Sequence, residues 1–179
     1  MEQVGEWSHN KTPIPQQIRI MMDINRYLSE ESGSVDNVYY SVENNTIGEA
    51  ALISIAELGE ENICGTFLSE PKIHGNARAY RRGFNTTHKN KISVCSKFKT
   101  LVETERLKLK SKALISELKT FVAQGNSYSA KSGDTDDLIM ASLLVIRMAS
   151  VIKNYDPVLD DKIRDGEDFD VEPMPFVVM

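Results

Sequence analysis

Glu43, Asp136 and Asp137 are the residues whose types and spacing could bind a metal ion. Glu43 directly follows a β-rich segment that is expected to be buried. A carboxylate at the carboxyl end of a buried strand is a typical functional position in α/β folds; the alternative is a Glu that only bonds a neighbouring turn. The two Asp residues open a strongly apolar segment, and Asp134 precedes them.

The Asp cluster has two interpretations. In the first, the carboxylates cap a helix, because they accept hydrogen bonds from its free N–H groups and complement its macrodipole. In the second, a divalent cation relieves the repulsion among three close carboxylates. The following segment is apolar on nearly every face, which predicts a helix at the centre of the fold.

A shared metal centre would follow if the strand before Glu43 packs against the helix that begins at Asp136 and Asp137. Carboxylate oxygens suit Mg²⁺ or Mn²⁺, and the corresponding chemistry is two-metal hydrolysis of a phosphodiester. The sequence offers no Ser/His/Asp or Cys/His nucleophile set and no Walker A motif.

Between Lys72 and Lys99 the chain holds 8 Lys or Arg residues and no acid, although the net charge of the whole chain is −5. Such a window indicates a polyanion partner such as nucleic acid; the alternative is a solvated surface. The candidate DNA-binding residues are Arg78, Arg81, Arg82, Lys89 and Lys91.

The elements that must position these residues alternate along the chain. Strands are expected at 2–8, 37–42, 62–68 and 106–109, and helices begin near 13, 46, 92, 111 and 136. The alternation predicts an α/β fold with a parallel or mixed sheet. The helix after Ser111 is expected to reach Gly125, with Glu117 on its solvated face.

Residues 1–155 are expected to form one domain, and 156–179 an extended acidic tail. Residues 156–172 hold 8 acidic and 2 basic residues. No apolar run approaches the roughly 18 residues of a membrane span, and no signal peptide is evident. The two distant cysteines fit a reducing compartment.

The sequence resembles the C-terminal nuclease domain of the large terminase subunit of tailed bacteriophages, close to the T-even-like group. Each matching motif is weak alone, whereas their order and spacing are specific. The motifs are Glu2-Gln3-Val4-Gly5, Val42-Glu43-Asn44-Asn45 with Gly48, Gly83 through Thr87 with Lys91, Leu107-Lys108-Leu109, Ile115-Ser116-Glu117-Leu118 with Phe121, and Gly133 through Met140.

This resemblance implies an RNase H-like mixed sheet flanked by helices, and a Mg²⁺- or Mn²⁺-dependent endonuclease that cuts concatemeric viral DNA. Glu43 matches the second member of the family's acidic triad, and Asp137, or its neighbour Asp136, the third. Lys91 and the basic window match a region near DNA. The implied partners are double-stranded DNA, an N-terminal terminase fragment or ATPase domain, the portal and the small terminase subunit. The implied location is the host cytoplasm during phage assembly.

The family's first triad Asp lies on a strand that precedes the part matched by Glu2 to Gly5. The chain is therefore expected to be an N-terminally truncated, incomplete nuclease that takes this Asp from another chain. It would be the product of a split gene or a truncated chain. The alternatives are a non-cleaving RNase H-like module that binds DNA or the portal, and another RNase H-like nuclease such as a resolvase or transposase.

Overall fold

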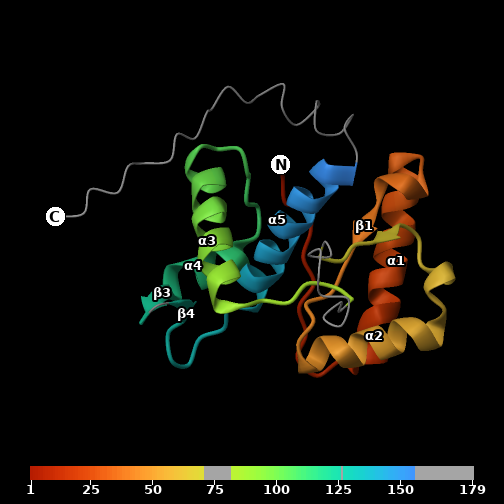
Figure 1. Ribbon diagram of the computed structural model, residues 1–179, viewed down its shortest axis with the longest axis horizontal. Coiled ribbons are helices and arrows are strands. Elements are labelled where there is room, and N and C mark those ends of the chain that lie inside the picture. Colours follow the sequence, from red (N-terminus) through yellow and green to blue (C-terminus); the bar gives the residue numbers. More distant parts are fainter. Residues whose placement is uncertain (71–81, 126, 156–179) are drawn as a thin grey trace, which may run out of the picture.

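The computed structural model describes residues 1–70, 82–125 and 127–155. Five helices and four short strands occupy these ranges (Figure 1). Their bounds are α1 (Ile14–Ser32), β1 (Tyr39–Tyr40), α2 (Thr46–Leu58), β2 (Thr66–Phe67), α3 (His88–Glu103), α4 (Lys112–Thr120), β3 (Phe121–Gln124), β4 (Ser127–Ala130) and α5 (Asp137–Tyr155). The expected mixture of helices and strands is confirmed.

The first half of the chain packs α1 and α2 against a parallel strand pair. Strand β1 pairs with β2, with Tyr39 opposite Thr66 and Tyr40 opposite Phe67. Ile18 of α1, Ile55 of α2 and Tyr40 are buried together in one apolar core. This arrangement agrees with the predicted strand, helix, strand order, since parallel neighbours need a crossover connection.

The second half packs α3 and α4 against the first half of α5. Phe98 and Leu101 of α3 meet Leu114 of α4 and Ile139 of α5 in a second core. A hairpin of β3 and β4 follows α4, with Gly125 in its turn at a φ of 57°. The helix after Ser111 therefore ends at Thr120 rather than at Gly125. The aromatic and β-branched residues at its expected end instead form a strand, where such side chains pack well.

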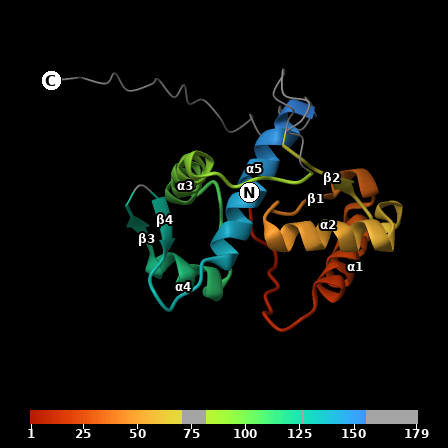
Figure 2. The same cartoon turned by 60° about the horizontal axis from the view of Figure 1, so that its bottom comes forward.

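Helix α5 lies between the two halves, as Figures 1 and 2 both show. Its first part belongs to the core with α3 and α4. Further along, Met148 and Val151 pack against Leu68 and Phe84, which belong to the first half of the chain. The predicted central position of this helix is confirmed, although Val145 on one side is 57% exposed.

The strands are much shorter than the sequence predicts, and they do not join into one sheet. The described residues form two separate two-stranded sheets and two isolated parallel bridges, Glu2 with Lys108 and Glu43 with Phe84. The expected strands at 2–8 and 106–109 thus meet at one residue pair.

The described residues do not include the acidic tail at 156–179 or residues 71–81. None of the helices in residues 1–70, 82–125 or 127–155 combines the length and apolar character that a membrane crossing requires.

Candidate functional site

Glu43 lies just beyond β1 and forms an isolated parallel bridge with Phe84. Phe84 N donates to Val42 O at 3.1 Å, and Asn44 N donates to Phe84 O at 2.7 Å. These two bonds hold the backbone on both sides of Glu43. The half-buried carboxylate accepts a hydrogen bond from Asn45 Nδ2 at 3.3 Å. The sequence predicts that Glu43 directly follows a strand over residues 37–42, whereas β1 already ends at Tyr40.

The segment after Glu43 turns directly into α2. Asn45 caps the helix, because its side-chain oxygen accepts from Gly48 N at 2.8 Å. Gly48 is buried, and its Cα faces the main chain of Glu43. A Cβ at this position would lie 2.8 Å from the Glu43 carbonyl carbon and closer still to its oxygen. Glycine at 48 therefore permits the close approach between α2 and the Glu43 backbone.

Glu117 of α4, and neither Asp136 nor Asp137, provides a side-chain cap for the start of α5. Its Oε2 accepts from the backbone N–H groups of Leu138 at 3.0 Å and Ile139 at 3.1 Å. Its Oε1 accepts from Thr135 Oγ1 at 3.1 Å. The expectation that Glu117 is solvated is wrong. No local sequence pattern identifies Glu117 as this cap, because its carboxylate meets the start of α5 only through tertiary packing.

Asp136 is half-buried and faces α3. Its Oδ2 lies 3.4 Å from Lys91 Nζ, and the Lys91 ammonium also lies 5.5 Å from the centroid of the Phe121 ring. Only 16% of the Lys91 side chain is exposed, so this cation is directed into the protein. Burial raises the pKa of the nearby Cys95 thiol; Lys91 opposes this shift and Asp136 adds to it. Asp137 is exposed at the first position of α5.

The structure does not bring Glu43 and the Asp pair into one metal-binding group. Among the described residues, no three His, Cys, Asp or Glu side chains lie close enough to hold a metal ion. Glu43 acts electrostatically on Arg147, which lies about 15 Å along α5 from Asp137 at 1.5 Å per residue. Carboxylate oxygens suit Mg²⁺ or Mn²⁺. To bind one shared ion, however, Glu43 and the Asp pair must come closer to each other.

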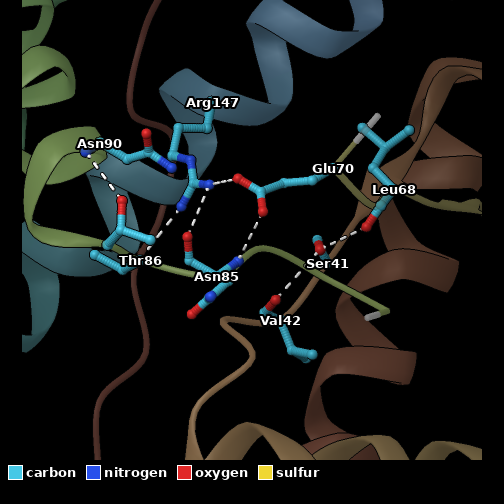
Figure 3. Close-up of polar contacts among 9 residues, drawn as sticks. Ser41, Val42, Leu68, Glu70, Asn85, Thr86, Asn90 and Arg147 are labelled. Carbon is cyan, nitrogen blue, oxygen red and sulfur yellow. Dashed lines mark hydrogen bonds and ion pairs between the residues drawn. The ribbon is translucent and has the colours of Figure 1, made fainter. Parts of the chain in front are cut away.

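Arg147 is a functional candidate that the sequence reasoning missed. It extends from the middle of α5 toward the segments that flank the first sheet (Figure 3). It pairs with Glu70, donates to Asn85 O at 3.1 Å and to Thr86 Oγ1 at 3.4 Å. Its guanidinium lies 5.0 Å from the centroid of the Phe84 ring. The available signal was that Arg147 is the single charged residue between Leu138 and Ile152.

The side chain of Arg147 is largely shielded from solvent. Its side chain is 11% exposed. Burial lowers the pKa of its guanidinium, and the Glu43 carboxylate opposes that shift. Glu70 also accepts from Asn85 N at 3.3 Å, so one carboxylate ties α5 to the strand region. Arg147 thereby connects the backbone next to Glu43 with the central helix.

The predicted DNA-binding residues have different surroundings. Arg82 pairs with Glu60 and stacks at 4.7 Å over the Phe67 ring, and Lys91 pairs with Asp136. Lys89 is exposed on the first turn of α3. Arg78 and Arg81 lie outside the described residues. Two of the three described candidates thus have a carboxylate partner within the chain.

Replacing Glu117 by alanine is expected to destabilise the protein by about 1–2 kcal/mol, the usual cost of losing a helix cap. Urea unfolding measures this loss, and amide exchange at Leu138 and Ile139 should accelerate because both lose their acceptor. The exposed Glu57 of α2 provides the control, since Glu57→Ala removes no cap. Equal stabilities of the two variants would refute the capping role.

No family model matches the sequence.

Proposed function

We propose that the chain is the RNase H-like nuclease part of a phage DNA-packaging terminase. It would cut concatemeric viral DNA by metal-dependent hydrolysis of a phosphodiester. The proposal rests on the order and spacing of the resembling motifs. The parallel pair of β1 and β2, with Glu43 just beyond β1, supports it, because carboxyl ends of parallel strands are common functional positions.

The cap that Glu117 provides is the structural observation that supports metal binding by Asp136 and Asp137. Because Glu117 accepts the hydrogen bonds of the Leu138 and Ile139 amides, capping does not account for Asp136 and Asp137. Both Asp residues nevertheless stand at the first turn of α5, where a third carboxylate already adds repulsion. A divalent cation would offset the repulsion that remains after Lys91 pairs with Asp136, which supports metal binding over the capping interpretation.

Asp136, Asp137 and Glu43 would hold Mg²⁺ or Mn²⁺ together with one further carboxylate. The bound ions would supply an activated water and stabilise the leaving oxygen. To bind the metal ion, Asp136 must then break its ion pair with Lys91. Glu43 and the Asp pair must also approach each other in the completed assembly.

An apolar groove beside α5 supports completion by a partner chain. Its volume is about 330 Å³, and its lining includes Val4, Trp7, Leu109 and Val145. The extended segment before α1 pairs with Lys108 on one edge, whereas Val4 is 83% exposed. An exposed edge beside an apolar floor suits an added strand. We propose that an N-terminal terminase fragment or the ATPase domain supplies that strand.

The further partners in this proposal are double-stranded DNA, the portal and the small terminase subunit, in the cytoplasm of the infected host. The alternative is an RNase H-like module that binds DNA or the portal without cutting. The ion pair between Lys91 and Asp136 favours this alternative, because an internal cation there already offsets one carboxylate charge.

Plasmid nicking with Mn²⁺ tests the proposed nuclease, using the chain alone and with an N-terminal fragment. Glu43→Gln is expected to lower cleavage by at least about a hundredfold, beyond the loss typical of a group that only supports a metal ligand. Asp137→Asn should have a similar effect. Glu57→Gln, an exposed site on α2, is the matched control.

Cleavage only with the fragment would support a carboxylate from another chain. Cleavage that survives Glu43→Gln would refute the site assignment. Salt-dependent DNA binding without cleavage under either condition would favour the non-cleaving module.

A further inference from the structure

Lys91 is an internal cation at the contact between α3 and the start of α5. Its ammonium faces the Asp136 carboxylate, and both side chains are largely buried. The Phe121 ring of β3 lies close to the same ammonium. A carboxylate and an aromatic face are two kinds of group that stabilise a cation shielded from water.

The position of Lys91 in α3 does not itself favour a cation. The first turn of α3, from His88 to Lys91, contains no acidic residue, and the macrodipole of a helix disfavours positive charge at its N-terminus. A buried charge is also costly unless it is paired. The tertiary contact with Asp136 is therefore the main interaction that keeps this ammonium inside the protein.

The Lys91 side chain can leave Asp136 while the backbone of α3 stays in place. Thr87 caps the helix, because its Oγ1 accepts from Asn90 N at 3.2 Å, and Lys91 N donates to Thr87 O at 2.9 Å. These bonds fix the start of the helix. The four-carbon stem of lysine is flexible, so rotation about its own bonds is sufficient to move the ammonium toward solvent.

A divalent ion and the Lys91 ammonium compete for the same carboxylate. An ion bound to Asp136 Oδ2 would lie beside Lys91 Nζ, which is 3.4 Å from that oxygen, and two cations so close repel each other. The oxygen ligands that Asp136 and the adjacent Asp137 offer suit Mg²⁺ or Mn²⁺. The pairing in this structure therefore opposes metal binding, and metal binding opposes the pairing.

We propose that Lys91 is an intramolecular competitor of divalent metal at Asp136 and thereby controls when the start of α5 binds the metal. The inference rests on the proposed function for the presence of a metal at this position, and it adds the regulation of that site. It also gives Lys91 a role other than the DNA contact expected from the sequence.

Mn²⁺ binding without DNA tests the competition, with the electron paramagnetic resonance signal of free Mn²⁺ as the readout. Lys91→Met keeps an apolar stem near Phe121 but removes the charge, and it is expected to lower the Kd for Mn²⁺ at least about tenfold. Lys89→Met is the matched control, because Lys89 is exposed in the same turn of α3. Its effect should be less than about twofold, since salt screens an exposed charge.

A second substitution locates the bound ion. In the Lys91→Met background, Asp136→Asn should remove the gain in Mn²⁺ affinity. Asp23→Asn should leave that gain unchanged, because Asp23 is 74% exposed on α1. Circular dichroism shows whether each variant folds. Thermal unfolding should show a larger stabilisation by Mn²⁺ for Lys91→Met than for the parent, as tighter binding to the native state requires.

Equal Mn²⁺ affinities of the parent and Lys91→Met, no Mn²⁺ binding by either protein, or equal gains from both lysine variants would overturn the proposal. Tighter Mn²⁺ binding by Lys91→Met without plasmid nicking, with or without the N-terminal fragment, would support the competition while the proposed nuclease fails. Nicking that requires Asp137, together with a Mn²⁺ affinity that is insensitive to Lys91→Met, would support the nuclease and refute the competition.

Discussion

Replacing Gly48 by alanine is expected to destabilise the protein by about 1–3 kcal/mol, the cost of overpacking a close contact. The added Cβ would lie 2.8 Å from the Glu43 carbonyl carbon, so the backbone that carries Glu43 must move. An opposing term exists, because alanine favours a helix interior over glycine by about 1 kcal/mol. Since the obstacle is backbone rather than a flexible side chain, we expect the clash to exceed that gain.

Urea unfolding measures the Gly48→Ala effect. Gly5→Ala is the control, because no atom lies within 4 Å of a Cβ at Gly5, and its effect should stay within about 0.5 kcal/mol. A stabilised Gly48→Ala variant would show that α2 does not approach Glu43 this closely. In the nuclease assay, the same substitution should lower cleavage, because it displaces a proposed metal ligand.

Replacing Arg147 by methionine is expected to destabilise the protein by about 2–3 kcal/mol. Removing one partner of a fully buried ion pair costs about 3–5 kcal/mol, and the 35% exposure of the Glu70 side chain reduces that cost. Methionine keeps much of the apolar stem of arginine, so the loss of stability measures the contribution of the guanidinium group. Asn85 O and Thr86 Oγ1 lose a donor in the same variant.

A double-mutant cycle with Glu70→Gln isolates the ion pair. We expect a coupling of about 1–2 kcal/mol between Arg147 and Glu70, within the range of contacting residues. Arg26→Met is the control, because the Arg26–Asp23 pair at 3.6 Å is 57% and 74% exposed. Such a surface pair should contribute less than about 1 kcal/mol. Additive effects at Arg147 and Glu70 would contradict their pairing.

The Arg147 network gives the central helix a role beyond apolar packing. It joins α5 to Glu70 and Asn85, near the parallel bridge that holds Glu43. If both variants behave as expected, the surroundings of Glu43 depend on α2 from one side and on α5 from the other. The Glu43 backbone would then be positioned by a local contact with α2 and by the Arg147 network of α5.

Local signals in the sequence were sufficient for most helices. Helix α2 begins at Thr46, as expected, and Gly59 follows its last residue. Ser111 caps α4 as expected and accepts from Leu114 N at 2.9 Å. The apolar composition after Asp137 correctly predicted a central helix. Caps, glycine stops and apolar periodicity act within a few residues, so one sequence displays them directly.

Tertiary structure decided the features that join distant segments. Glu117 caps α5 across the packing of two helices, and Arg147 reaches segments of the first half of the chain. The expected continuous sheet did not form among the described residues, because strand pairing needs neighbours that local sequence does not specify. For the same reason, the sequence supplied Glu43, Asp136 and Asp137 as metal-binding candidates but not the distance between them. That distance depends on how α5 packs against the first sheet.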